Sequence, residues 1–285
     1  MTYHELWRML TSVYEAGEAQ AVARMVYEVR FGLSLSDICI GKDSQLSADG
    51  QTQLEEIAQR LLNQEPVQYV LGETTFAGRT FKVTPDVLIP RPETAELCNW
   101  LINTSSSLSG KRVLDVGTGS GCIAVTLALA WPEADVTGWD ISAEALAVAQ
   151  ENAKHLGARV SFKQVDILKK VLVSLPWEGA GETSCHLIVS NPPYITAHEA
   201  TVMEHNVLDW EPHRALFVPD NDPLLFYNAI ARYAQQALVP QGWLYFEINP
   251  LYADELNKLL STMGYHNIEI KTDQYGKQRM IRAQR

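Results

Sequence analysis

The 285-residue sequence has few cysteines, no excess of positive charge and no long apolar run. Its four cysteines (Cys39, Cys98, Cys122 and Cys185) are widely separated, without a CxxC pair or a histidine at metal-ligand spacing. This pattern argues against a disulfide framework or a zinc site and favours reduced thiols. No apolar run approaches the roughly 20 residues that span a bilayer. The first ten residues also lack the basic and apolar regions of a signal peptide. We therefore expect a cytoplasmic protein with no membrane partner and no metal.

Positive charge is scarce along the whole chain. There are 23 Lys and Arg against 34 Asp and Glu, a net charge of −11, and residues 1–72 alone carry five against ten. A protein that binds nucleic acid stably normally presents a basic face, because neutralising phosphates supplies much of its affinity. We expect no stable nucleic-acid binding. The 46% hydrophobic content is that of an ordinary globular protein with a substantial core.

Residues 1–72 are predicted to form a small helical bundle. Apolar residues recur there at helical spacing in three segments, the second of which stops at Gly32 and the third at Pro66. The pattern alone leaves open whether these stripes are core or docking surface. They comprise Leu6, Trp7, Leu10, Val13 and Tyr14; then Val22, Met25, Val26 and Val29; then Leu54, Ile57, Ala58, Leu61 and Leu62.

Residues 73–92 are predicted to be a linker between this bundle and a second domain over residues 93–285. The stretch TTFAGRTFKV alternates around Ala77-Gly78, as in a β-hairpin. LIPRPETAEL follows, with two prolines before a predicted helix. Arg91 and Glu93 in this stretch are candidates either for supporting a ligand or for fixing the linker.

From residue 111 onward, strand and helix patterns alternate, which predicts a doubly wound, mainly parallel α/β sheet. The last two strands are joined only by the short turn YGK, which leaves no room for a crossover helix, so they must be antiparallel. The expected fold is a seven-stranded Rossmann-like sheet with an antiparallel last strand, joined to a small N-terminal helical domain. The predicted strands are 112–116, 135–139, 160–165, 186–190, 242–248, 266–272 and 278–283.

The stretch VLDVGTGSGCIAVTLALA has the pattern of a strand, a glycine turn and an apolar helix. Such a turn can simply let the strand and the helix pack closely without binding any ligand. A glycine motif alone is therefore weak support for a ligand site. Here the spacing is GxGxG, and Asp115 lies inside the strand just ahead of it. A dinucleotide pyrophosphate prefers amide N–H groups with no carboxylate nearby. The ammonium of S-adenosylmethionine tolerates an acid, so the pattern favours this methyl donor over NAD. The candidate residues of the turn are Gly117, Thr118, Gly119, Ser120 and Gly121.

Acids also end the next two predicted strands. Asp140 lies 23 residues after Gly117, where a carboxylate can accept hydrogen bonds from both ribose hydroxyls. Its simpler role would be a helix cap, but Ser142 already supplies one. Asp166 ends the third strand, where it could accept from the adenine amino group while Ile167 packs on the ring.

The fourth strand ends in SNPPYI, residues 190–195. In an open α/β sheet the fourth strand returns beside the first, so Asn191, Pro192, Pro193 and Tyr194 should face the glycine turn. A planar NH₂ group is a poor nucleophile. The Asn191 side-chain oxygen and the Pro192 carbonyl could hold its two hydrogens, while the prolines offer no competing donor. Tyr194 could stack on the flat group and orient it. This predicts methyl transfer to an amide or amine nitrogen, without a general base.

Two acceptors satisfy this chemistry: the amide of a protein side chain and the exocyclic amine of a nucleobase. The acidity of both parts of the chain counts against a nucleic-acid adenine. A non-catalytic binding module is a further alternative, and the intact glycine turn and NPPY sequence argue against it.

Over nearly its whole length the chain resembles the release-factor glutamine methyltransferases. The matching elements are the helical N-terminal part, GETTFAGRTFKV, LIPRPETAEL, DVGTGSG, Asp140, NPPYI, EPHRAL and DQYGKQR. Two segments differ from the family pattern: VPDNDPLLFY stands in place of Gly-Gly-x-Asp-Gly-Leu, and FEINP in place of Glu-Ile-Gly, so Asn249 replaces a glycine.

The resemblance implies an S-adenosylmethionine-dependent enzyme that methylates the glutamine amide in the Gly-Gly-Gln loop of class 1 peptide-chain release factors. It implies that residues 191–194 grip that glutamine, that residues 1–72 dock the release factor, and that residues 93–285 are the catalytic domain. A sister group that acts on a glutamine of a ribosomal protein shares the core motifs. We expect a monomer.

Overall fold

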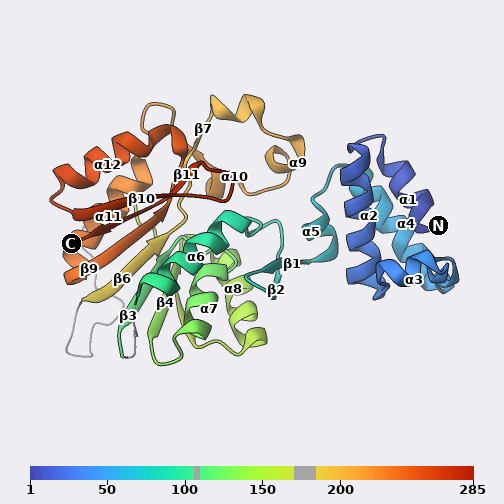
Figure 1. Ribbon diagram of the computed structural model, residues 1–285, viewed down its shortest axis with the longest axis horizontal. Helices are drawn as coiled ribbons and strands as arrows, with labels where there is room; N and C mark the ends of the chain where they lie inside the picture. The colour runs from blue at the N-terminus through green and yellow to red at the C-terminus, as the bar shows by residue number, and fades with distance from the viewer. Residues whose placement is uncertain (106–109, 170–183) are drawn as a thin grey trace. The chain divides into compact units, whose positions relative to one another are not determined.

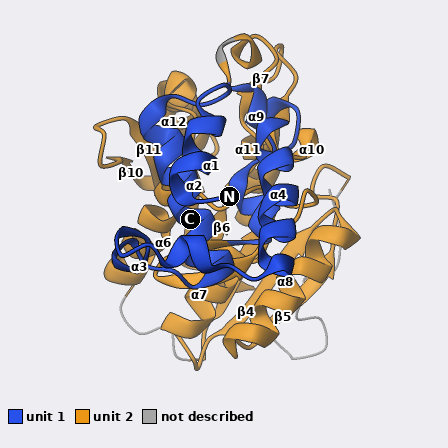
Figure 2. Cartoon of the chain, turned by 90° about the vertical axis from the view of Figure 1, so that its right-hand side faces the viewer, with its two compact units in different colours: residues 1–73, 204–210 blue, residues 74–203, 211–285 orange. Residues whose placement is uncertain are grey.

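The computed structural model describes residues 1–105, 110–169 and 184–285 of the chain (Figure 1). Contacts between residues divide the chain into two units, coloured separately in Figure 2. The first unit is Met1–Glu73 together with Glu204–Trp210, and the second is Thr74–Met203 together with Glu211–Arg285. No helix among the described residues is long and apolar enough to cross a membrane.

The first unit is helical, as predicted. Thr2 and Glu5 form a capping box, and Ser47 accepts a hydrogen bond from the Gly50 N–H, so two helices begin where side chains satisfy free backbone donors. Gly32, at φ +65°, ends the longest of these helices. The elements are α1 (Tyr3–Leu10), α2 (Ala16–Phe31), α3 (Leu35–Cys39), η1 (Lys42–Gln45), α4 (Ala48–Leu62), α5 (Val67–Leu71) and, in the returning segment, α9 (His205–Leu208).

Most of the predicted apolar stripes form the core of this unit. Leu6, Leu10 and Leu54, for example, are fully buried. Met25 and Val29 are different, because they are 37% and 43% exposed. The apolar stripe of α2, which the pattern left open as core or docking surface, is therefore only partly core: the helix buries a narrower face than its apolar residues suggest.

The second unit begins with the predicted hairpin, formed by β1 (Glu73–Phe76) and β2 (Arg79–Lys82). Ala77 and Gly78 both have positive φ, at +48° and +74°, as a two-residue hairpin turn requires. The proline-rich stretch then leads into α6 (Pro92–Thr104), with Pro92 at the first position of the helix, where no N–H is needed.

The seven-stranded sheet has the order β10-β11-β9-β6-β3-β4-β5. β6 pairs in parallel with β3, and β11 is antiparallel to both of its neighbours, which confirms the predicted topology. The fifth strand begins at residue 238 instead of 242, and every other predicted strand boundary agrees with the structure to within one residue. The strands are β3 (Arg112–Val116), β4 (Asp135–Asp140), β5 (Val160–Gln164), β6 (Cys185–Ser190), β9 (Leu238–Glu247), β10 (His266–Thr272) and β11 (Gln278–Gln284).

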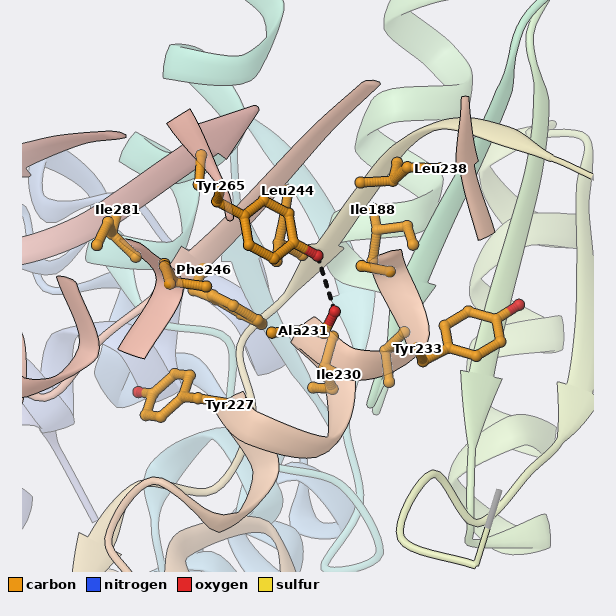
Figure 3. Close-up of a cluster of buried hydrophobic side chains, with 14 of the residues drawn as sticks. Ile188, Tyr227, Ile230, Ala231, Tyr233, Leu238, Leu244, Phe246, Tyr265 and Ile281 are labelled. Atoms are coloured by element: carbon orange, nitrogen blue, oxygen red, sulfur yellow. Dashed lines mark hydrogen bonds between the residues drawn. The ribbon is translucent and has the colours of Figure 1, made fainter. Parts of the chain in front are cut away.

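Helices cover both faces of this sheet, and successive residues of β6 belong to different cores. Ile188 packs in a cluster with residues of α11 (Leu225–Ala237) and α12 (Ala253–Thr262). Figure 3 shows part of this cluster, in which the Tyr265 hydroxyl donates to the Ala231 carbonyl at 2.7 Å. Leu187 and Val189 instead pack with α6, α7 (Cys122–Ala130) and α8 (Ala143–Leu156). Burial on both faces explains the continuous apolar run of this strand.

Besides α9, α11 and α12, the connections after β6 contain short elements: β7 (Ile195–Thr196), η2 (Glu199–Val202), α10 (His213–Leu216), β8 (Phe217–Val218) and η3 (Pro250–Tyr252). β7 and β8 pair in parallel.

Candidate active site

A cavity of about 340 Å³ lies at the edge of the sheet where β3, β4, β5 and β6 end. Its walls come entirely from the second unit. They include the linker, the glycine turn and the segments that follow β4, β5 and β6. The lining residues are 86–91, 116–120, 140–142, 165–168 and 190–193, together with Thr94, Cys122, Ile123, Ala145, Pro212, Arg214, Ala215, Phe226 and Ile230.

The backbone of the glycine turn adopts a conformation that favours glycine. Gly117, Gly119 and Gly121 all have φ between +53° and +80°. A side chain at Gly121 would also lie 3.0 Å from the Cβ of Ala149 on α8. The turn ends at α7, whose N-cap residue, Gly121, has no side chain to cap it. Backbone N–H groups at the start of a helix suit an anion such as a carboxylate.

Asp115 lies beneath this turn, fully buried, and does not line the cavity. Its Oδ2 accepts hydrogen bonds from the Thr118 hydroxyl (2.6 Å) and the Ala124 N–H (3.2 Å), so it ties the turn to the first turn of α7. Burial raises the pKa of Asp115 to about 7, although these two hydrogen bonds oppose the shift. The structure gives this residue a role in holding the turn, and its predicted contact with a cofactor stays a prediction.

Asp140, Asp166 and Ile167 all line the cavity. Asp140 accepts from the Gly119 N–H (2.9 Å) and the Ser142 N–H (3.0 Å). Burial raises the pKa of Asp140, and the hydrogen bonds from these N–H groups oppose the shift. Ser142 caps α8, as expected, by accepting from the Ala145 N–H at 3.1 Å.

The NPPY sequence follows β6, and three of its four residues line the same cavity: Asn191, Pro192 and Pro193. Tyr194 does not. Its ring packs partly buried against the core, and its hydroxyl donates to Glu247 Oε1 at 3.1 Å. The structure therefore brings the glycine turn, Asp140, Asp166 and Asn191 together around one cavity, and sets Tyr194 behind it.

Asn191 belongs to a buried polar network with Thr94 and Glu247, which the sequence patterns did not predict. Asn191 Nδ2 donates to Thr94 Oγ1 at 3.2 Å, and the Thr94 hydroxyl donates to Glu247 Oε2 at 2.6 Å. Thr94 and Glu247 are each 2% exposed. Burial raises the pKa of Glu247, while the Thr94 and Tyr194 hydroxyls and the charge of Arg279 lower it. An acid at the end of an otherwise apolar strand, WLYFE, was the available signal.

The linker wall of the cavity is fixed by a second buried acid. Glu211, which is 3% exposed, forms an ion pair with Arg91 and accepts from the Ile89 N–H at 3.1 Å. Arg91 itself lines the cavity, whereas Glu93 does not. Arg91 thus fixes the linker and also borders the cavity, while its support of a ligand stays a prediction.

Comparison with known proteins identifies the family. Residues 8–72 match a family model described as the PrmC N-terminal domain, and residues 107–207 match one described as a methyltransferase domain. A release factor glutamine methyltransferase from Bacteroides thetaiotaomicron is 45% identical over 276 residues, which is 97% of this chain and 96% of that protein. The chain belongs to the release factor glutamine methyltransferase family.

A second relative of this family also aligns over almost the whole of both chains. The release factor glutamine methyltransferase of Flavobacterium psychrophilum is 40% identical, over 96% of this chain and 94% of that protein. Among solved structures, a T. thermophilus 16S rRNA methyltransferase in complex with AdoMet and guanosine aligns with a TM-score of 0.54 and 18% identity, over 75% of this chain and 49% of that chain. At this identity the likeness bears on the fold alone.

Proposed function

We propose that this enzyme transfers a methyl group from S-adenosylmethionine to the side-chain amide nitrogen of the glutamine in the Gly-Gly-Gln motif of class 1 release factors. The observation that carries the proposal is the single cavity, which is bordered by both the glycine turn and Asn191-Pro192-Pro193. Family membership adds support, because the relatives that match almost the whole chain are named for this activity.

The residues around the cavity fit the chemical parts of S-adenosylmethionine. The N–H groups of the glycine turn and the start of α7 suit its carboxylate, and Asp140 suits the ribose hydroxyls. Ile167 and Ile141 offer apolar surface for the adenine, with Asp166 beside them. Ser120 also borders the cavity, and its hydroxyl is buried beside the Cys122 thiol. When bound, the cofactor would supply an electrophilic methyl group and would leave as S-adenosylhomocysteine.

The chain's own part in the reaction is to hold and polarise the amide. Asn191 Oδ1 and the Pro192 carbonyl can accept the two hydrogens of the substrate NH₂ group and draw electron density onto its nitrogen. Neither proline contributes an N–H that would compete. After transfer, the methylated nitrogen is acidic enough to lose a proton to water, so no general base is needed.

The test is methyl transfer from labelled S-adenosylmethionine to purified substrates. We expect label in an intact class 1 release factor and none in the same factor with the Gly-Gly-Gln glutamine changed to alanine. Parallel reactions contain ribosomal proteins, DNA and RNA. Label in nucleic acid but not in the release factor would overturn the proposal, and label in a ribosomal protein alone would redirect it to the sister activity.

A further inference from the structure

The amide of Asn191 can be oriented in two ways, and only one serves the chemistry. An Asn side chain presents an acceptor oxygen on one branch and a two-hydrogen donor on the other, at nearly the same positions. If the donor branch faced the cavity, it would repel a substrate NH₂ group. The proposed function therefore needs something that holds the oxygen toward the cavity.

Thr94 has the position and chemistry to do this. It lies on α6, 2% exposed, next to Asn191, and its hydroxyl carries a single hydrogen. That hydrogen is directed at Glu247 Oε2, 2.6 Å away. The Thr94 oxygen can then only accept from Asn191, which requires the Nδ2 branch of the amide to face Thr94.

Glu247 in turn is held as an acceptor. In its ionised form a carboxylate has no hydrogen to donate. The Tyr194 hydroxyl donates to the other oxygen, Oε1, at 3.1 Å, so hydroxyl groups approach both oxygens. Burial raises the pKa of Glu247, whereas the two hydroxyl hydrogen bonds and the charge of Arg279 favour the ionised form. With Glu247 ionised, the direction of each hydrogen bond is fixed from Glu247 outward to Asn191.

We propose that Thr94 and Glu247 are positioning residues that fix the orientation of the Asn191 amide, with Oδ1 toward the cavity and Nδ2 toward Thr94. This inference rests on the proposed function, because it assigns the orientation that glutamine binding needs. Thr94 borders the cavity beside Asn191, and Glu247 lies behind Thr94. Both act through Asn191.

A double-mutant cycle tests this coupling through single-turnover methyl transfer to the release factor. Thr94→Val keeps the shape of the side chain but removes the hydroxyl, and it should slow transfer about tenfold, the effect of losing one hydrogen bond of roughly 1.4 kcal/mol. Asn191→Ala should slow transfer by about 10²–10³. In the Asn191→Ala background, Thr94→Val should cost less than about twofold, since nothing remains for it to orient.

Two further variants separate orientation from a general effect on structure. Thr94→Ser retains the hydroxyl and should restore transfer to within about threefold of wild type. Thr104→Val makes the same change at the far end of α6, where the hydroxyl donates to the Trp100 carbonyl, and should leave the rate unchanged. Affinity for S-adenosylmethionine should stay close to that of the wild type in the Thr94 and Thr104 single variants, which also reports that they are folded, whereas Asn191→Ala should lose some affinity because Asn191 is also a candidate cofactor contact. If Thr94→Val does not fold, Thr94→Cys takes its place, because a thiol donates and accepts only weakly.

The outcomes distinguish this inference from the proposed function. A wild-type rate for Thr94→Val, or an equal cost with and without Asn191, would overturn the positioning role while glutamine methylation stands. No methylation of the glutamine by the wild-type enzyme would instead overturn the proposed function.

Discussion

The acids at the ends of β3 and β4 have different environments, although the sequence presents them alike. Asp115 is fully buried and bonds to the glycine turn from below. Asp140 borders the cavity and bonds to the same turn through the Gly119 N–H. A carboxylate at a strand end can thus shape a ligand-binding turn or reach the ligand itself, and the two roles give different mutational effects.

Asp140→Ala should weaken S-adenosylmethionine binding by about 1–3 kcal/mol, because it removes hydrogen bonds to a charged group and frees the Gly119 N–H. Isothermal titration calorimetry measures the change. Asp135→Ala is the matched control, since Asp135 is exposed at the opposite end of β4 and should keep wild-type affinity. Unchanged affinity in Asp140→Ala would remove this residue from the cofactor site, and micromolar binding of NAD would argue against the cofactor assignment.

Asp115 should make the stability of the cofactor-free protein depend on pH. Its pKa is about 7 in the folded state against an ordinary value of 3.8, so the folded state holds this proton more tightly than the unfolded state. Between these two values its contribution to stability therefore falls as the pH rises. Asp115→Asn lacks this titration. The melting temperature of Asp115→Asn minus that of the wild type should increase from about pH 5 to about pH 8, and a constant or decreasing difference would contradict the shifted pKa.

At the scale of elements, Asn249 joins the loop after β9 to the loop after β6. Its Nδ2 donates to the Tyr194 carbonyl at 3.1 Å and to Glu199 Oε1 at 2.9 Å, and its Oδ1 accepts from the Leu251 N–H. Asn249 is 4% exposed and stands where the family pattern has glycine. This chain thus adds a side-chain link to the backbone of its NPPY sequence.

Asn249→Ala should lower the free energy of unfolding by about 1–3 kcal/mol, because it leaves buried acceptors without their donor. Urea unfolding measures this loss. Asn99→Ala provides the control, since Asn99 is exposed on α6 and its replacement should change stability by less than about 0.5 kcal/mol. Equal effects of the two substitutions would show that the link contributes nothing to stability.

The helices and strands could be predicted from the sequence wherever the local pattern of apolar residues and turns determines them. Alternating strand and helix signals predicted the parallel part of the sheet, and the short turn between the last two strands required them to be antiparallel. The network of Thr94, Glu247 and Asn191 could not be predicted, because Asn191 and Glu247 lie 97 and 153 residues from Thr94 and meet it only through the sheet. The exposure of Met25 was also beyond local pattern, since it depends on which neighbours cover α2.

At the scale of the whole molecule, the cavity and the sheet belong to one unit. Every residue around the cavity lies in Thr74–Met203 or Glu211–Arg285. The first unit contains the N-terminal helices and also the returning segment Glu204–Trp210, which the predicted boundary at residue 72 does not include. Removing residues 1–72 would therefore leave this segment without the rest of its unit.

We predict that a chain beginning at residue 73 binds S-adenosylmethionine with nearly full-length affinity, because its cavity is complete without the first unit. It should methylate an intact release factor much more slowly, since we propose that the N-terminal helices dock this substrate. A short peptide containing Gly-Gly-Gln is the control substrate: it is too small to need a docking unit, so both chains should methylate it at similar rates. Full-length rates on the intact factor would contradict the docking role. Loss of cofactor binding would show instead that the second unit needs the first in order to fold, because residues 204–210 lie in the sequence between two of the segments that border the cavity.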